Sequence, residues 1–193
     1  MDQHLKMAAV FAAMGLSLGG CMTNANPMSP MADAIVTVGG APMYPTKNIV
    51  ENAMNSADHT TLVAAVKAAG LVDTLSGPGP FTVFAPTNAA FAKLPAGTVD
   101  TLLKPENVGM LRSILTYHVV PGRLSAADIM AMISAGGGSA LLTTVNGGQL
   151  RASMDGNTIV LTDAKGGMSR VTQGNVFQSN GVIHVTDSVS LPG

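Results

Sequence analysis

Residues 79–91 read GPFTVFAPTNAAF, and the centre of the expected fold follows from these 13 residues. Its segment 81–85 consists of strand-forming residues and is apolar on both sides, which predicts a central, buried strand. Pro86 breaks the strand, because proline has no N–H to donate to a sheet. Thr87 then stands where its side chain can cap a short helix through residues 89–91. The stretch therefore predicts a buried strand that passes directly into a helix.

The sequence before this strand has helical periodicity. Apolar residues recur on one face over residues 49–54 and again over residues 62–69. Asp58 is a candidate N-cap of the second helix, and Gly70 is a candidate stop at its end. Residues 76–80, which read SGPGP, force a loop before the strand. Two helices are therefore expected ahead of the central strand.

The sequence after this strand changes from helical to strand periodicity. A helix is expected from Pro105, and another from Ser125, whose side chain can form a capping box with Asp128. Short β candidates follow at residues 141–145, 149–153, 158–161, 171–176 and 182–185. Helices followed by strands predict an α+β fold with a mostly antiparallel sheet, and the length of 193 residues favours a single domain.

The first 20 residues have the layout of an export signal. Lys6 precedes an uncharged apolar run over residues 7–20, which is shorter than a membrane-spanning helix. The segment Leu18-Gly19-Gly20-Cys21 resembles the bacterial lipoprotein signal, in which the cysteine carries the lipid. The alternative is a free or buried thiol after an ordinary signal. Met22 after this cysteine favours the outer membrane over the inner one.

Residues 21–45 contain four prolines and little periodicity, which is typical of an extended tether. A short strand over residues 35–38 is the alternative within it, because Ile35, Val36 and Val38 are β-branched. The sequence thus divides into a lipoprotein-type signal peptide over residues 1–20, a tether over residues 21–45 and a folded domain over residues 46–193.

The composition argues against nucleic-acid binding and catalysis. Ten basic and 11 acidic residues give a net charge of -1, and no basic stripe is present that could neutralise a run of phosphates. The sequence has no Gly-x-Ser-x-Gly elbow and no phosphate-binding loop. Its one cysteine is the expected lipid carrier, and its acidic residues are mostly isolated. We therefore expect a protein that is not an enzyme and needs no cofactor.

The candidate metal ligands are sparse. The histidines, at positions 4, 59, 118 and 184, do not have the spacing of a zinc site. The 13 methionines offer thioethers that suit Cu(I). Met130 lies on an expected apolar helix face and Met28 in the expected tether, however, so a packing or tether role is favoured. No metal site is predicted.

Three segments together resemble the fasciclin domain family. They are residues 79–91, residues 115–122 with the sequence LTYHVVPG, and residues 179–187 with the sequence SNGVIHVTD. The resemblance covers about residues 46–192 and implies a β-wedge with several packed helices. It also implies extracellular adhesion through partner proteins or glycans. The chain departs from the family at Asn175, where many members carry aspartate.

The resemblance selects a set of binding or motif candidates: Thr87, Asn88, Tyr117, His118, Asn180, His184 and Asp187. Tyr117 and His118 form the family's Tyr-His pair, and on a strand these neighbours would point to opposite faces. A structural role with His118 hydrogen-bonded inside the fold is favoured over direct partner contact. His184 is expected in the core, and Asn180 in a tight turn. Asp187 is expected to close a local hydrogen-bond network.

Two functions remain open. The first is an exported, non-catalytic adhesion or interaction module at the cell envelope, held in the outer membrane or periplasm by a lipid on Cys21, with surface proteins or glycans as partners. The alternative is a carrier of a small apolar ligand such as a carotenoid. The resemblance suggests both, and the high apolar content of 47% also agrees with the second.

Overall fold

The computed structural model describes residues 35–193. The predicted signal peptide over residues 1–20, the lipid carrier Cys21 and the start of the predicted tether lie outside the described residues. The described helices are α1 (Ile49–Asn55), α2 (Thr60–Ala68), α3 (Val72–Ser76), α4 (Asn88–Ala92), α5 (Thr98–Leu102), α6 (Val108–Tyr117) and α7 (Ala126–Ala135), with 3-10 turns at Ala57–His59 (η1) and Pro105–Asn107 (η2). None of these helices is long and apolar enough to cross a membrane.

Seven strands form one sheet in the order β4-β3-β9-β8-β7-β6-β5. The strands are β3 (Phe81–Pro86), β4 (Val119–Pro121), β5 (Ser139–Thr143), β6 (Gln149–Asp155), β7 (Thr158–Thr162), β8 (Met168–Gln178) and β9 (Gly181–Thr186). Strands β3 and β9 run parallel, and every other neighbouring pair is antiparallel. The Val145 N–H donates to the Val119 carbonyl at 2.8 Å, which brings the two edges of the sheet together. The predicted α+β class with a mostly antiparallel sheet is confirmed.

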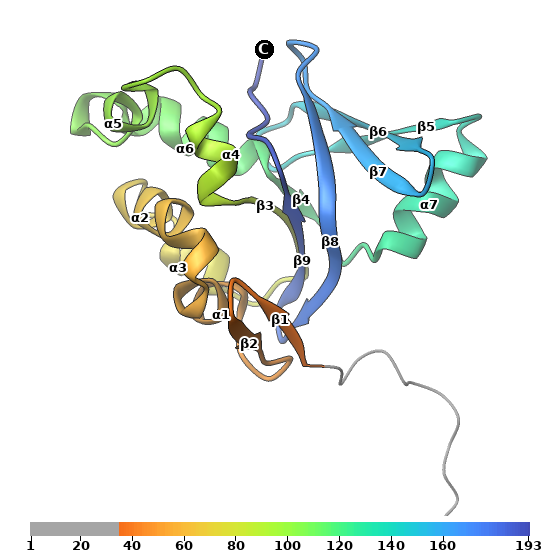
Figure 1. The fold of residues 1–193 in the computed structure, drawn as a ribbon, viewed down its shortest axis with the longest axis horizontal. Coiled ribbons are helices and arrows are strands. Elements are labelled where there is room, and N and C mark those ends of the chain that lie inside the picture. Colours follow the sequence, from red (N-terminus) through yellow and green to blue (C-terminus); the bar gives the residue numbers. More distant parts are fainter. Residues whose placement is uncertain (1–34) are drawn as a thin grey trace, which may run out of the picture.

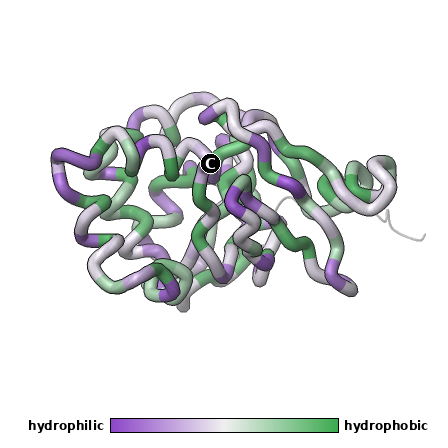
Figure 2. The backbone as a smooth tube through the Cα atoms, turned by 90° about the horizontal axis from the view of Figure 1, so that it is seen from above, coloured by the Kyte–Doolittle hydropathy of each residue, from purple (hydrophilic) through white to green (hydrophobic). Residues whose placement is uncertain are grey.

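Strand β3 separates two hydrophobic cores, because side chains alternate between the two faces of a strand. Val83 and Ala85 pack into a core with helices α1, α2, α3 and α6, whereas Phe84 packs into a second core with α7 and strands β5 to β7. Figure 1 shows this division, with α1 to α6 on one side of β3 and β9 and α7 on the other. In Figure 2 the hydrophobic segments run through the interior of both halves. The prediction of a central strand buried on both sides is thus confirmed.

The helix starts follow from local capping. The Thr87 hydroxyl accepts a hydrogen bond from the Ala90 N–H, and Ser125 forms the predicted capping box with Asp128. Asn48 forms a further capping box with Glu51 at the start of α1. The prediction that Asp58 caps a helix is wrong: this residue lies inside the 3-10 turn η1, where its own backbone is already helical.

The predicted tether is wrong for residues 36–43, which form a folded hairpin. Strand β1 (Val36–Val38) pairs with β2 (Ala41–Met43) across a turn at Gly39-Gly40, where both glycines have positive φ. Val38 and Met43 are buried in the first core. The Thr37 carbonyl accepts a hydrogen bond from Gln173 Nε2 at 3.2 Å, which ties the hairpin to β8. The folded domain therefore begins before residue 46.

Candidate functional site

The Tyr-His pair lies at the end of a helix. Tyr117 is the last residue of α6, and His118 follows it in a helical backbone conformation, with its N–H donating to the Leu115 carbonyl. The two side chains are 1% and 3% exposed, so both are buried. The prediction that the pair lies on a strand is wrong, because α6 continues through Tyr117 and His118 caps it directly before β4. The two side chains nevertheless point to opposite sides: Tyr117 packs into the second core, and His118 lies on the side of α1 to α3.

His118 links helix α6 to the C-terminal segment. Its Nδ1 donates to the Ile114 carbonyl at 2.8 Å, and its Nε2 accepts from the Ser190 N–H at 3.0 Å. A backbone N–H can only donate, so Nε2 must be unprotonated and the proton sits on Nδ1. Burial lowers the pKa of His118, which keeps the ring neutral. Both ring nitrogens are therefore occupied by the fold itself.

Tyr117 joins two loops on the other side of the sheet. Its hydroxyl donates to the Gln149 carbonyl at 2.7 Å and accepts from the Ala164 N–H at 3.1 Å. Burial raises the pKa of Tyr117, which holds the phenol protonated. Its ring also passes so close to Gly148 that a Cβ there would lie 2.6 Å from ring carbon Cε2. The chain needs glycine at this position to let the ring in.

His184 lies in the second core, as its apolar surroundings in the sequence predict. Its ring stacks on Phe84 with centroids 5.6 Å apart, and its Nε2 donates to the Leu124 carbonyl at 2.9 Å. Its Nδ1 has no hydrogen-bond partner among the described residues. Burial lowers the pKa of His184, so this ring is neutral as well.

Asn88 and Asn180 each fasten a helix end. Asn88 accepts from the Thr61 N–H at 3.0 Å and donates to the Ala57 carbonyl at 2.8 Å, which holds the start of α2. Asn180 accepts from the Ile49 N–H at 3.0 Å and donates to the Leu75 and Gly77 carbonyls, which joins α1 to the end of α3. It also lies in the predicted tight turn, because β8 and β9 are connected through residues 179–180.

Asp187 closes a local network, as predicted. Its carboxylate accepts from the Arg170 N–H at 2.8 Å and pairs with Lys93 Nζ at 3.2 Å. Partial burial raises the pKa of Asp187, but the hydrogen bonds and the lysine charge outweigh this effect and leave the pKa below its ordinary value.

The candidate residues do not meet in one site. Residues 87 and 187 follow the paired ends of β3 and β9 at Pro86 and Thr186, whereas Asn180 precedes the opposite ends, where Phe81 pairs with Gly181. Tyr117, His118 and His184 are buried between these ends. Over residues 35–193 no three His, Cys, Asp or Glu side chains form a cluster that could hold a metal ion. The described motif residues therefore hold separate parts of the fold together by hydrogen bonds and packing.

Sequence reasoning missed two asparagine side chains that form hydrogen bonds between distant parts of the chain. Asn175 has a positive φ of 59°, and its side chain accepts from the Ala126 N–H at 2.8 Å, which fastens the start of α7. Asn52 donates to Gln178 in the interior, across 126 residues of sequence. Local pattern carries no signal for such a distant pair. Asn175 was singled out only as a departure from the family.

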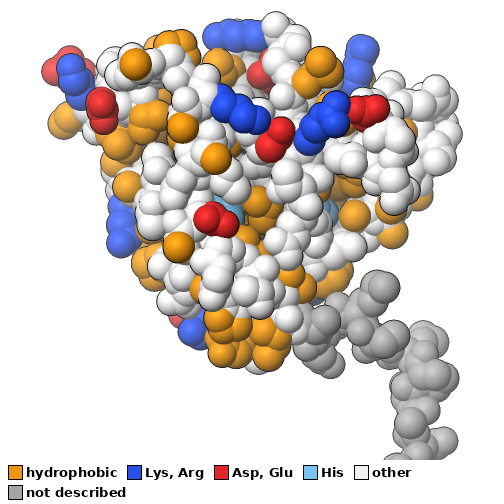
Figure 3. All heavy atoms as spheres, viewed as in Figure 1, with side chains coloured by type: hydrophobic (Ala, Val, Ile, Leu, Met, Phe, Trp, Pro, Cys, Tyr) orange, Lys and Arg blue, Asp and Glu red, His pale blue; other side chains and the backbone are white. Residues whose placement is uncertain are grey.

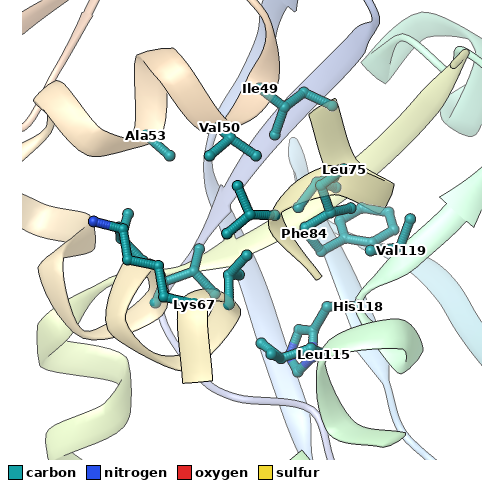
Figure 4. A pocket seen from close by; sticks show the side chains of 14 residues that line it. Ile49, Val50, Ala53, Lys67, Leu75, Phe84, Leu115, His118 and Val119 are labelled. Atoms are coloured by element: carbon teal, nitrogen blue, oxygen red, sulfur yellow. The ribbon is translucent and has the colours of Figure 1, made fainter. Parts of the chain in front are cut away.

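Sequence reasoning also missed an apolar cleft between helices α1, α2 and α3 and strand β3. The cleft is open to solvent and has a free volume of about 30 Å³. Its walls come from three helices and its floor from β3 and the end of α6: Ile49, Val50, Ala53, Leu62, Val63, Val66, Lys67, Val72, Leu75, Val83, Phe84, Leu115, His118 and Val119. Figure 4 shows the carbon-rich lining of this cleft. Its lining is almost entirely apolar, which makes it a candidate binding site.

Comparison with known proteins gives a consistent family assignment. The model of the fasciclin domain matches residues 57–192. Protein sll1483 from Synechocystis is 43% identical over 193 residues, which covers 100% of this chain and 99% of that protein. The immunogenic protein MPB70 from Mycobacterium bovis is 34% identical, with 97% of this chain and 99% of that protein covered.

Two further comparisons extend to surface proteins. The cell surface glycolipoprotein MPB83 from Mycobacterium bovis is 37% identical over 63% of this chain and 48% of that protein. The structure of a domain pair from the insect cell adhesion molecule fasciclin I shares the fold, with a TM-score of 0.66, 20% identity, and coverage of 76% of this chain and 51% of that one. The sequence matches and the shared fold together show that this chain belongs to the fasciclin domain family.

Proposed function

We propose that this protein is an exported, non-catalytic interaction module of the cell envelope, anchored by a lipid on Cys21 and acting through surface proteins or glycans. The observation that carries the proposal is the fasciclin domain over residues 57–192. In this domain the side chains of Tyr117, His118 and His184 are buried and form hydrogen bonds with the backbone. Because these side chains are not accessible to a partner, a partner would be recognised by other residues at the protein surface. The relative named a cell surface glycolipoprotein and the fold shared with an insect cell adhesion molecule support this view.

The exposed charges agree with recognition by shape and neutral polar contacts. Figure 3 shows basic and acidic side chains interspersed along one edge of the visible face. Two ion pairs lie at the surface: Arg170 with Asp155, both exposed, and Lys93 with the half-buried Asp187. Interspersed charges give no large field of one sign, so we expect partner binding with weak dependence on ionic strength.

A soluble form that begins at Ile35, the first described residue, tests this proposal. We expect it to bind matrix proteins, glycans or envelope surfaces more strongly than the same protein after denaturation, in a plate or biosensor assay. Raising the salt from 50 to 300 mM should change the affinity by less than about threefold, because few charged contacts are involved. Binding no better than that of the denatured control on every surface would refute the interaction function.

Cys21 provides the test of the anchor. In cells that express the full chain, we expect replacement of Cys21 by Ser to abolish incorporation of a labelled fatty acid and to shift the protein from the membrane fraction to the soluble fraction. Met22→Leu, at the neighbouring residue, is the matched control, and this variant should still incorporate the labelled fatty acid. A Cys21→Ser chain that still incorporates the lipid would show that the anchor lies elsewhere.

The apolar cleft favours a second candidate function, the carriage of a small apolar ligand. Ligand sites are concave and mostly apolar, and the cleft meets both criteria, but its free volume of about 30 Å³ is below the roughly 300–1,000 Å³ of such sites, so a ligand would have to separate the helices that line it. Protein purified from its own host should then yield an apolar compound on solvent extraction, with a visible absorption band if the compound is a carotenoid. A colourless extract free of lipid would argue against this candidate.

A further inference from the structure

A polar groove lies on the outer face of strands β5, β6 and β7, the strands that stand apart from α1 to α6 in Figure 1. It is open to solvent and has a free volume of about 650 Å³, which falls within the roughly 300–1,000 Å³ of ligand sites. Its walls are the loop of residues 144–148, which joins β5 to β6, and the loop of residues 163–167, which joins β7 to β8. The groove shares no residue with the apolar cleft.

The strand register places three side chains side by side on the floor of this groove. Leu141 pairs with Arg151 across β5 and β6, and Arg151 pairs with Thr162 across β6 and β7. Residues that pair directly point to the same face of a sheet, and the neighbours of these residues within each strand pack into the second core. The three side chains therefore point away from the core and into the groove.

Tyr117 fixes the two walls of the groove from below. Its hydroxyl donates to the Gln149 carbonyl and accepts from the Ala164 N–H, so one buried side chain bonds a residue at each wall. The Asp163 carboxylate accepts from two N–H groups of its own loop at 2.9 and 2.7 Å, which closes this loop on itself. Walls that are held in this way lose little conformational freedom when a ligand binds.

Arg151 is the charge that the groove offers to a ligand. It is exposed and forms no ion pair with any carboxylate of residues 35–193. Asp163 also lines the groove, but it is 8% exposed, and its second carboxylate oxygen accepts from the Leu191 N–H at 2.8 Å. Because a guanidinium group can bind a carboxylate through two parallel hydrogen bonds, Arg151 favours a ligand that carries a carboxylate.

The rest of the groove favours a glycan over a peptide. Its floor is the face of a sheet, so it has no row of free backbone groups to which an extended peptide could add as a strand. Leu141 is the only large apolar side chain in the described lining, whereas a docked helix needs several apolar anchors. Gln149 and Thr162 carry an amide and a hydroxyl, which can donate to and accept from the hydroxyl groups of a sugar.

We propose that this groove binds an acidic glycan that contains hexuronate units, with one carboxylate paired with Arg151 and neighbouring sugar hydroxyls bonded to Gln149 and Thr162. This inference rests on the proposed interaction function, and it adds to that function the site and the chemical class of the glycan. A single exposed ion pair also agrees with the weak dependence on ionic strength that we expect for partner binding.

Oligouronates and their methyl esters test the role of the carboxylate, because esterification removes the charge and keeps the sugar chain. The probes are tetrasaccharides of galacturonate, mannuronate, guluronate and hyaluronan, each as the free acid and as the methyl ester. The protein is the full chain with Cys21→Ser, which cannot carry the lipid on this residue, and affinities are measured by calorimetry. For at least one of these glycans we expect the acid to bind about fivefold more tightly than its ester, as for a solvent-exposed ion pair.

Three variants locate the site. Arg151→Met should reduce the affinity for the acid to that for the ester and leave the ester unaffected. Thr162→Glu places a carboxylate opposite Arg151 on the neighbouring strand, where it forms a stabilising cross-strand pair, occupies the guanidinium and repels the acid. It should weaken binding of the acid at least tenfold while the circular dichroism spectrum stays that of the folded protein. The matched control is Arg123→Met, which removes an exposed arginine beside Phe177 at the other end of β8 and should change neither affinity.

Each result supports or overturns the inference. Equal affinities for every acid and its ester, or an Arg151→Met variant that binds the acid as well as the unaltered chain does, would overturn it. An equal loss in Arg123→Met would show general attraction to positive charge and would overturn the site. Tighter binding of tetraglutamate than of any oligouronate would assign the groove to acidic peptides instead. If no oligouronate bound while the soluble form from Ile35 still bound an envelope surface, this inference would be wrong and the interaction function would stand.

Discussion

Replacement of His118 by alanine is expected to lower the free energy of unfolding by about 4 kcal/mol. The ring is 3% exposed, so its removal leaves a cavity in the interior. It also leaves the Ile114 carbonyl and the Ser190 N–H without their partner. A loss of this size is a large fraction of the 5–15 kcal/mol that is typical of a folded domain. Urea unfolding of the soluble form from Ile35, followed by circular dichroism, measures the change.

The matched control for this prediction is Met110, on the same helix. Its side chain is 60% exposed, so Met110→Ala should change the free energy of unfolding by less than about 0.5 kcal/mol. Partner binding is measured for both variants below the unfolding transition. If His118→Ala abolished binding and left stability unchanged, His118 would be a recognition residue, and the structural role given to it above would be wrong.

The parts of the fold that could be predicted depend on local signals. The alternation of side chains along β3, the cap at Thr87 and the capping box at Ser125 all act within a few residues of sequence. Each of these elements was therefore recognisable before any tertiary contact was known. Asp58 failed as a cap because an additional 3-10 turn begins before it, and element boundaries depend on such details.

The errors arise where tertiary packing overrides a local pattern. Residues 117–120 resemble a strand because Val119 and Val120 follow the Tyr-His pair, yet α6 continues through Tyr117 as Leu111, Ile114 and Leu115 pack into the first core. The hairpin at residues 36–43 has its own strand and turn signals. Its prolines nevertheless favoured a tether, and the contacts with the core and with β8 that stabilise it come from far along the chain.

The candidate site was less predictable than the fold. The family motifs pointed to polar residues, and the structure places these residues as internal fasteners at separate points. The cleft depends on how three short helices are arranged over β3, which no local pattern encodes. The sequence of α2 contains part of the information: Val63 and Val66 lie on one face of the helix, and Lys67 lies at the edge of this face. This pattern predicts an apolar helix face with a charge beside it, but it does not predict which elements pack against that face.

Stability is expected to fall steeply as the pH decreases below about 6.5, because three neutral histidines are buried. Burial lowers the pKa of His59, His118 and His184 in the folded protein. In the unfolded chain each has its ordinary pKa of about 6.5, so below this pH the unfolded chain binds more protons than the folded one. The free energy of unfolding therefore rises with pH across this range and falls on acidification.

The size of this effect follows from the number of protons. Three histidines that are charged only in the unfolded chain give a limiting slope of about 4 kcal/mol per pH unit, which is approached below pH 6.5 and above their folded-state pKa values. Urea unfolding of the form from Ile35 between pH 5 and 7.5 measures this slope, above the range in which carboxylates titrate.

The control is His184→Gln, which keeps a donor for the Leu124 carbonyl but cannot titrate. The slope of the free energy of unfolding against pH should be about one third smaller for this variant. A stability independent of pH over this range would mean that the rings accept protons in the folded state, and the neutral tautomer deduced for His118 would then be wrong.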